Sequence, residues 1–357
     1  MAFLTRDAKL YLDKVRESTY NTPQTTNTNY ERIVTTNQVV AIPNQEFRTD
    51  LGRAGSEFAS AICNTYWEPT QLAVQGEGDF AAMGRLALRA VGGTITDTTV
   101  VSAAAFKHSA PMLSSASSLQ LPSFNMIAAV EGSGASYLYT GCVVDRFRME
   151  KQAGQVAQMS FDVLGSGKHR SPHGISSLPA TPSFACLDTY SFLSYDNGGA
   201  VDLSASCRAR SWFVELANNH TPANDRCDGD STQIPGVDTT ATGTGKAAYT
   251  SKLEHGDRVV SAEIQLELDA NFDEWDDMAE KVTLTNVTLG FRGAILDGTA
   301  PTYETVQVIL PSAVFQTARF TDLNGKAGVT LSLLPLTSGT SVMTVEVVNA
   351  ITATNYK

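Results

Sequence analysis

Within residues 259–270, VVSAEIQLELDA, the stretch 260–269 alternates strictly between apolar and polar side chains. A period of two is the repeat of a β-strand that has one buried face and one face in water. The apolar face of this predicted strand comprises Val260, Ala262, Ile264, Leu266 and Leu268. Thr, Ser, Ala, Gly and Val are abundant elsewhere and helical periodicity is rare, so we predict a mainly β protein.

Residues 143–167, VVDRFRMEKQAGQVAQMSFDVLGSG, predict a β-hairpin whose turn contains Gly154. The second strand alternates strictly, and its apolar face comprises Ala157, Met159, Phe161 and Val163. The first strand has a mixed face, because Asp145 falls among the apolar residues Val143, Phe147 and Met149. A similar hairpin is predicted at 313–339, with the apolar residues Phe315, Phe320, Val329 and Leu331.

A strand followed by a helix occurs once in each half of the chain. In the first half, a weaker strand at 71–78 precedes a helical pattern that Asp79 can cap. In the second half, the strand at 259–270 precedes an acidic helical pattern with Asn271 as its N-cap. An offset of 192 residues aligns the apolar positions of the two helices, Phe80 with Phe272, Met83 with Trp275 and Leu86 with Met278. The two hairpins follow with an offset of about 170, so we predict an internal duplication with loops of different length.

The duplicated pattern predicts two tandem domains. The first spans residues 1–170 and includes an N-terminal arm. The second spans residues 185–357 and contains a long polar loop at 218–250. Between them, residues 171–184 belong to a stretch rich in Gly, Ser and Pro, which is the composition of a linker.

The balance of charges restricts the possible partners. The formal net charge is −11, and the densest basic stretch is only Lys168–Arg170, which argues against a protein that grips nucleic acid through its phosphates. The five cysteines are odd in number and include no Cys-x-x-Cys, which favours a reducing cytoplasm over a secreted disulfide framework. No apolar run approaches 18 residues, so we expect no membrane span.

Two groups of polar residues have the residue types of metal sites without their complete patterns. His169 and His173 are spaced like metal ligands, but no Cys or acidic cluster completes a zinc set. Asp225, Asp228 and Asp230 match part of a calcium loop whose closing Glu is missing. The five scattered histidines and the lack of a nucleophile–base pattern give catalysis no support. We therefore expect no catalytic residue, cofactor or metal site.

The order and character of these elements resemble the tail tube proteins of tailed bacteriophages, in a long and internally duplicated form. In the first half the resemblance rests on the hairpin that Gly141 introduces, with its short Gly/Ser tail. In the second half it rests on segments in the same order: WFVELANN at 212–219, the strand at 259–270 with its acidic helix, VTLTNVTLGFRG at 282–293, YETVQVILPSAVFQTARF at 303–320, and the closing GVTLSLLPL and SVMTVEVVN. The resemblance covers about residues 30–350 and depends on the order of elements rather than on an invariant motif.

The resemblance implies a β-sandwich with a flanking helix in each domain, and a structural virion protein whose rings stack into a hollow tail tube. Neighbouring subunits are expected to join their inner hairpins around an acidic channel, through which genomic DNA passes without specific binding. Two domains per chain imply a homotrimeric ring with pseudo-sixfold symmetry, the alternative being a hexamer. The candidate channel and intersubunit residues are those of both hairpins: Val143, Phe147, Met149, Ala157, Met159, Phe161, Phe315, Phe320, Val329 and Leu331.

The same resemblance implies assembly in the host cytoplasm and a place in the tail of the virion. The tape measure protein and the tail terminator and tip proteins are the further partners that it implies, and no membrane is involved. Polar and irregular loops at 20–29, 98–125 and 218–245 are candidates for contacts between rings, because such segments can become ordered on assembly.

Two other classes of protein compete with this interpretation. One is an adhesion or carbohydrate-binding β-sandwich of a virion or cell surface, which should carry aromatic residues on its long loops, where this chain has almost none. The other is a hydrolase that uses paired acids such as Glu263 and Glu267. The simpler explanation for these acids is that they form the polar faces of a strand and of the helix that follows it.

Overall fold

The computed structural model of the protein describes residues 8–20, 22–24, 26–36, 45–49, 62–67, 70–77, 79–101, 104–113, 120–130, 136–166, 169–170, 190–203, 208–223, 252–269, 273–297, 302–337, 341–352 and 356. The predicted linker at 171–184 lies outside these ranges, as do Asn271, His173 and most of the predicted loop at 218–250.

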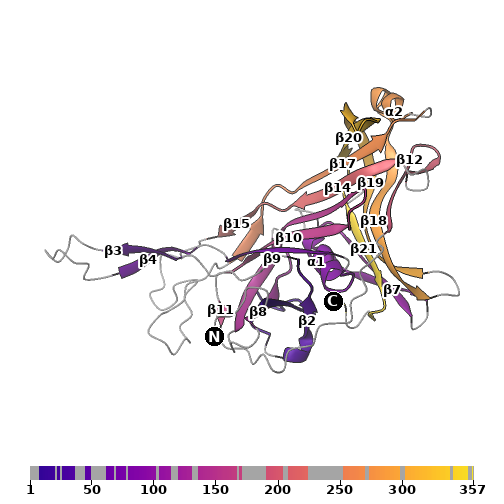
Figure 1. The fold of residues 1–357 in the computed structure, drawn as a ribbon. Helices are drawn as coiled ribbons and strands as arrows, with labels where there is room; N and C mark the ends of the chain where they lie inside the picture. The colour runs from indigo at the N-terminus through magenta and orange to yellow at the C-terminus, as the bar shows by residue number, and fades with distance from the viewer. Residues whose placement is uncertain are drawn as a thin grey trace.

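The described residues form 21 β-strands, two α-helices and a 3-10 helix at Asn27–Asn29 (Figure 1). The elements of the first half are β1 (Ala8–Asp13), β2 (Tyr30–Ile33), β3 (Gln45–Thr49), β4 (Ile62–Trp67), β5 (Thr70–Glu77), α1 (Ala82–Val91), β6 (Thr96–Val101), β7 (Ala105–Pro111), β8 (Phe124–Val130), β9 (Ser136–Gln152), β10 (Gln158–Gly165) and β11 (His169–Arg170). Those of the second half are β12 (Tyr190–Asp196), β13 (Ala200–Asp202), β14 (Ala209–Ala217), β15 (His220–Ala223), β16 (Lys252–His255), β17 (Val259–Glu267), α2 (Glu274–Glu280), β18 (Leu284–Asp297), β19 (Thr302–Asp322), β20 (Ala327–Pro335) and β21 (Thr344–Asn349). The mainly β class predicted from the sequence is confirmed.

Seven strands from both halves form one antiparallel sheet, which we call the central sheet. Its order is β5–β10–β9–β14–β17–β20–β19. A second set of pairings, β12–β18–β19–β21–β7–β6, uses the other part of β19. Likewise β9 pairs with β8 before it enters the central sheet. Because β9 and β19 run through two sets of pairings, they fold the strands over one apolar core that contains residues of both halves.

The strands before and after each helix are paired in the same pattern. In the first half, β10 pairs both with the long strand β9 and with β5, the strand before α1. In the second half, β20 pairs with the long strand β19 and with β17, the strand before α2. In addition, β8 and β11 flank the beginning of β9 as β18 and β21 flank the beginning of β19. We call β5, α1 and β8 to β11 the first unit, and β17, α2 and β18 to β21 the second unit.

The prediction of an irregular loop over 98–125 is wrong, because β6, β7 and the start of β8 lie in this range. Strand β7 is held by β6 on one edge and by β21 on the other. The pairing with β21 joins Ala110 to Val345 and Phe106 to Asn349, residues far apart in the chain. Local sequence could not reveal such a partner, and the Thr- and Ser-rich stretch therefore read as a loop.

The prediction that Val143 shares one face with the later apolar residues of β9 is also wrong, because β9 has a β-bulge at Asp145. The pairing with β10 shifts at this residue, which is the extra one between Val144 and Arg146. Val143 therefore joins a small cluster with Leu164, whereas Val144 faces the main core. The mixed face seen in the sequence consists of two faces that meet at the bulge.

Helix α1 is buried along its whole length, together with the two arginines that it carries. Nε of Arg85 lies 2.6 Å from the Glu31 carboxylate, and its guanidinium is 4.2 Å from the centre of the Tyr356 ring. Arg89 donates to the backbone oxygen of Asp13 at 2.7 Å, and burial lowers its pKa to about 9. One apolar face was predicted for this helix, but it is enclosed on several sides because β2, β7, β9 and β21 all contact it.

Ala81 occupies the N-cap position of α1, and the side chain of Asp79, the predicted cap, hydrogen-bonds to the backbone there. Its Oδ1 accepts hydrogen bonds from the backbone N–H groups of Ala81 and Ala82 at 3.1 and 3.0 Å. Burial nevertheless raises the pKa of Asp79 to about 6, well above the usual value of 3.8. The folded chain thus holds this proton more tightly than the unfolded chain, so the contribution of Asp79 to stability falls as the pH rises from about 4 to about 6.

We predict that Asp79→Asn raises the free energy of unfolding at pH 8 by up to about 3 kcal/mol. The amide keeps an oxygen for the cap and removes the cost of burying a charge. At pH 4 the difference from the natural chain should become small. Denaturant unfolding at the two pH values measures both quantities, and an equal difference at pH 4 and pH 8 would contradict the prediction.

Candidate assembly surfaces

The two halves of the chain are joined edge to edge, because β9 of the first half pairs with β14 of the second (Figure 1). The pairs run antiparallel from Arg146 opposite Ala217 to Gln152 opposite Ser211. The other edge of β14 pairs with β17, so the central sheet continues from one unit into the next. This ladder and the pairing of β7 with β21 join the halves through their backbones.

The bulged residue Asp145 holds the end of β14. Its Oδ1 accepts a hydrogen bond from the backbone N–H of His220 at 2.7 Å and lies 3.0 Å from Nδ1 of the same residue. Its backbone oxygen accepts a hydrogen bond from the N–H of Asn218 at 2.7 Å. Burial favours the neutral carboxyl, but the hydrogen bonds from His220 outweigh burial and lower the pKa of Asp145. The bulge thus aims a carboxylate at the strand that arrives from the other half.

Asn218 and Arg258 of the second half close the C-terminal end of α1. Nδ2 of Asn218 donates to the backbone oxygens of Ala90 and Val144 at 3.0 and 2.8 Å. Arg258 donates from Nε to Oδ1 of Asn218 at 2.6 Å, and from Nη2 to the backbone oxygens of Ala90 and Val91. The last carbonyls of a helix have no partner within the helix, so these two side chains satisfy groups that burial would otherwise leave unpaired.

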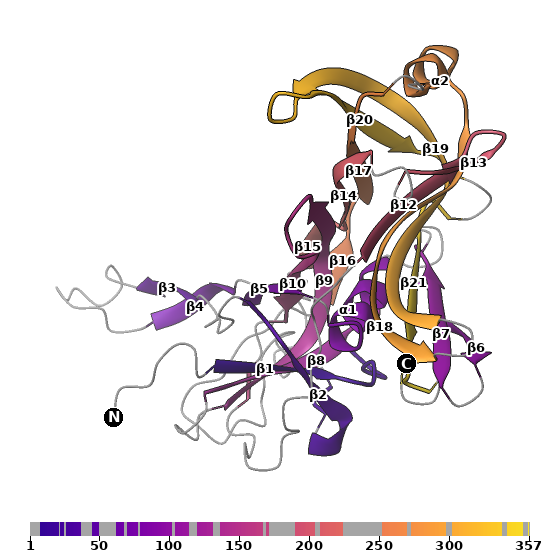
Figure 2. The ribbon, with the colours of Figure 1, turned by 45° about the vertical axis from the view of Figure 1, so that its right-hand side comes forward.

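A two-stranded sheet of β15 and β16, here called the second arm, covers the side of the first hairpin. Leu253 of β16 lies in one apolar cluster with Val143, Leu164 and Leu121. In the first half, β3 and β4 form a similar two-stranded sheet, here called the first arm. The first arm reaches away from the body of the molecule in both views (Figures 1 and 2).

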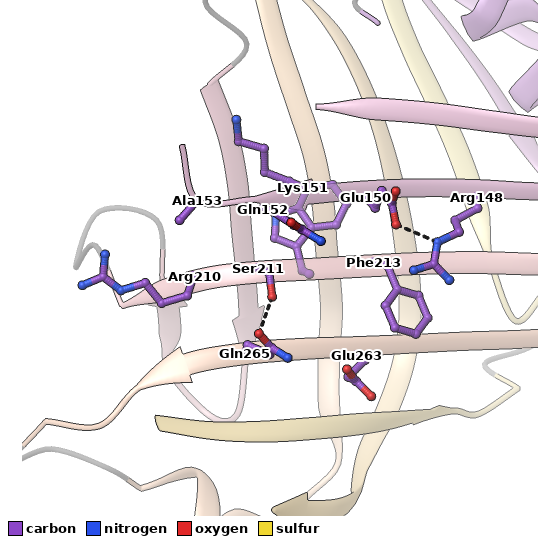
Figure 3. Close-up of a pocket in the computed structure, with 11 residues that line it drawn as sticks. Arg148, Glu150, Lys151, Gln152, Ala153, Arg210, Ser211, Phe213, Glu263 and Gln265 are labelled. Atoms are coloured by element: carbon purple, nitrogen blue, oxygen red, sulfur yellow. Dashed lines mark hydrogen bonds and ion pairs between the residues drawn. The ribbon is translucent and has the colours of Figure 1, made fainter. Parts of the chain in front are cut away.

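The polar face of the central sheet carries arginines that are paired with carboxylates. The carboxylate of Glu215 on β14 is ion-paired with both arginines. Its distances are 2.7 Å to Nη2 of Arg146 and 3.2 Å to Nη1 of Arg148. Arg148 also donates to Glu150 at 2.9 Å, and its guanidinium lies 4.1 Å from the centre of the Phe213 ring (Figure 3). The hydrogen bond to Glu215 raises the pKa of Arg146. These side chains cross the joint between the halves on the face opposite to the core.

A hollow of about 420 Å³ opens on this face where β9, β14 and β17 meet (Figure 3). Charges of both signs line it, among them Lys151, Arg210 and Glu263. Glu263 and Glu267, the acids of the hydrolase alternative, both lie on β17. The Glu267 carboxylate is ion-paired with Arg210 and with Lys326, so it serves the cohesion of neighbouring strands.

The predicted channel and intersubunit residues divide into two groups. Nine of the ten have at most 4% of their surface exposed and belong to the apolar core of the single chain: Val143, Phe147, Met149, Ala157, Met159, Phe161, Phe315, Val329 and Leu331. The tenth, Phe320, is 71% exposed. Its ring stacks on that of Trp275 in α2, which is also exposed, with 6.0 Å between the ring centres.

One edge of β19 is open beyond Ala313 in the part of the chain that the structure describes. Strand β18 pairs with this edge only as far as Ala313, while β20 continues along the opposite edge to Asp322. The hairpin of β19 and β20 projects at one end of the molecule beside α2 (Figure 2). An open edge presents unpaired backbone donors and acceptors, and it invites pairing with another chain.

Within the described ranges, no group of three or more His, Cys, Asp or Glu side chains is placed to hold a metal ion. His173, Asp225, Asp228 and Asp230 lie outside these ranges. None of the helices that the structure describes is both long and apolar enough to cross a membrane.

Sequence reasoning missed the residues that hold the two halves together. Asn218 and His220 fall at the beginning of the loop predicted at 218–250, yet they follow directly after β14 and hydrogen-bond to Val144 and Asp145 of β9. Arg258 precedes the most regular strand of the chain and was not singled out. A polar side chain on its own gives no signal of such a role, because its partners are carbonyls of a distant helix.

A family model described as phage tail tube protein matches residues 5–333 of the chain. No curated protein matches the chain significantly.

We predict that Asn218→Ala lowers the free energy of unfolding by about 2–4 kcal/mol, since it removes the hydrogen bonds from Nδ2 to the Ala90 and Val144 carbonyls and the acceptor for Nε of Arg258. The matched control is Thr221→Ala, an exposed residue three positions later, which should change stability by less than about 0.5 kcal/mol. Denaturant unfolding of both variants measures the difference. Equal effects of the two substitutions would show that the side chain of Asn218 does not hold the joint.

Proposed function

Because the chain belongs to the phage tail tube protein family, we propose that it polymerises as stacked rings into a hollow tube through which genomic DNA passes during ejection. The family assignment makes the protein a structural component of the virion tail. The open edge of β19, with the exposed Phe320 beside it, supports self-assembly by strand pairing.

We propose that the two units are copies of one ancestral tube unit, and that three chains close a ring with pseudo-sixfold symmetry. The observation that supports this is the recurrence of the same pairings around α1 and α2. The contact between β9 and β14 is of the heterologous type, since it joins two different strand edges. A heterologous contact repeated with a fixed rotation closes a ring when the rotation divides the full circle.

We further propose that the polar face of the central sheet lines the channel. The ten hairpin residues predicted for the channel would then support this lining, and the side chains between them would face the lumen. The pairing of Arg146 and Arg148 with Glu215 supports this proposal. Paired cations have less attraction for phosphate, and a chain of net charge −11 repels DNA, so the DNA can slide without being held.

The remaining partners follow from the family and stay proposals. A tube needs a protein that sets its length and proteins that end it, so the tape measure protein and the terminator and tip proteins are the expected partners. Assembly in the host cytoplasm precedes incorporation into the virion. No described feature favours the adhesion module or the hydrolase over the tube.

We predict that the purified protein at high concentration forms hollow striated cylinders, visible by negative-stain electron microscopy. Native mass spectrometry of single rings should give about 115 kDa for three copies of the 38.2-kDa chain, rather than about 230 kDa for six. A chain that remains monomeric under all conditions would contradict the proposed function. A six-chain ring would contradict only the equivalence of the two units.

We predict that Glu215→Gln increases affinity for DNA several-fold at low ionic strength, because it removes the carboxylate that Arg146 and Arg148 share. The matched control is Asp276→Asn, which removes the same charge from the exposed face of α2. Electrophoretic mobility shifts of a DNA fragment by assembled protein, at two salt concentrations, compare the variants. Equal affinities of the two variants would count against a channel role for this face.

A further inference from the structure

We propose that the second unit of one copy of the chain accepts a second copy, with Thr36 of that copy at the open edge of β19 and its first arm beside Leu334, as β14 and the second arm cover the first hairpin within one chain. This inference rests on the proposed function and specifies the surfaces by which copies of the chain join. Its basis is an equivalence of positions between the two units, established from β-bulges, buried contacts and strand order.

The two hairpins have their β-bulges at the same place. In the first, Asp145 is the extra residue, and the pairing shifts between Asp162 and Val163. In the second, Gln316 is the extra residue, and the pairing shifts between Ser332 and Leu333. The bulges give offsets of 171 residues for β9 and β19 and 170 for β10 and β20, which agree with the offset of about 170 in the sequence. Each residue of one hairpin therefore has a defined counterpart in the other.

This equivalence shows what is missing from the second unit. Beyond its bulge, β9 pairs with β14 on the edge that it earlier shares with β8. The corresponding edge of β19 pairs with β18 as far as Ala313, and beyond Ala313 no strand of the described residues pairs with it. The first unit thus has a covering strand, β14, from the second half of the chain, while the described residues provide no such strand for the second unit.

Three exposed apolar side chains of the second unit correspond to buried ones in the first. Phe320, Leu334 and Trp275 are 71%, 42% and 43% exposed. Their counterparts are Met149, Leu164 and Met83, which have at most 9% of their surface exposed. Burial of such residues by a partner removes apolar surface from water, which drives association. Exposure of the three in one chain marks where the partner lies.

The order of the strands identifies what covers them. In the second half, β14 leads into the second arm, and the arm leads into β17. In the first half, the first arm likewise leads into β5, the counterpart of β17. The second arm places Leu253 against Val143 and Leu164 of the first hairpin. The first arm, which points away from its own body, is the element that a neighbouring chain can accept against Leu334 (Figures 1 and 2).

A contact at the edge of β5 predicts the register between copies. Thr36 donates through its backbone N–H and its Oγ1 to the backbone oxygen of Gln75, at 2.8 and 3.2 Å. Gln75 lies opposite Ser160, and Gln265 lies opposite Thr330, the counterpart of Ser160, so Gln265 is the counterpart of Gln75. In the second half, Ser211 is opposite Gln265. Thr36 is therefore the counterpart of Ser211. Because Ser211 is also opposite Gln152, whose counterpart is Leu323, Thr36 of one copy should lie opposite Leu323 of the next.

Two complementary variants test the inference. Phe320→Asp damages the accepting edge and leaves the first arm intact, whereas replacement of residues 45–67 by a short Gly-Ser turn removes the arm and leaves the edge intact. We expect each variant to fold, to melt like the natural chain in its unassembled form, and to remain monomeric. An equimolar mixture should form a dimer that grows no further, since only one arm and one edge are functional.

Size-exclusion chromatography with light scattering distinguishes these outcomes. The matched control is Ile295→Asp, an apolar residue of β18 that is 58% exposed and lies outside the open edge, and this variant should assemble like the natural chain. A natural chain that stays monomeric would contradict the proposed function itself. If the natural chain assembles, then unaltered assembly of both variants, or a mixture that yields no dimer, overturns the present inference alone.

A disulfide tests the register. Opposite residues of antiparallel strands have Cα atoms about 4.5–5.5 Å apart, a distance that a disulfide can span. Thr36→Cys combined with Leu323→Cys should link copies into ladders under oxidation after assembly, and neither single variant should do so. Thr36→Cys combined with Ala327→Cys, on the other strand of the hairpin, is the matched control. Ladders of equal yield from both pairs, or none from the first, would contradict the predicted register.

Discussion

Backbone pairing along the edge of a long strand organises this structure. An edge that is not paired exposes a row of donors and acceptors, and a protein must cover it or use it. In β9 the strand β14 covers this edge and brings the second half of the chain into the same sheet. In β19 the corresponding edge stays open among the described residues. Pairing at the edge of a long strand therefore holds the chain together in β9, and the same kind of edge in β19 is available for assembly.

The joint also explains why charged and polar side chains lie deep in the core. The halves meet over α1, whose terminal carbonyls and arginines are removed from water when the sheet closes. Asn218 and Arg258 from the second half supply partners for the carbonyls, and Glu31 supplies one for Arg85. Such groups cost free energy if burial leaves them unpaired. Hydrogen bonds from the second half of the chain therefore stabilise the buried helix.

Much of the secondary structure was predictable, because alternation and capping are local. The strand β17, both hairpins and both helices lie where the patterns placed them, and the helices begin at Ala82 and Glu274, 192 residues apart as predicted. The bulge at Asp145 was not predictable, since an extra residue shifts the period by one and reads as a mixed face. β7 was missed because its partner, β21, lies in the other half of the chain. Likewise, the exposure of Phe320 could not be distinguished from burial by its place in an apolar pattern.

Local patterns and composition are enough to predict the β class, the two hairpins, the repeat of a strand followed by a helix, and an acidic chain without a basic patch, since each depends on neighbouring residues or on composition. Which strand edges are filled, and which remain open among the described residues, is settled in the folded chain. That choice depends on pairing between residues far apart in the chain, whose backbone groups are chemically alike at every position. The difference between a buried Met149 and an exposed Phe320 arises there, because a partner strand covers one and, within a single chain, not the other.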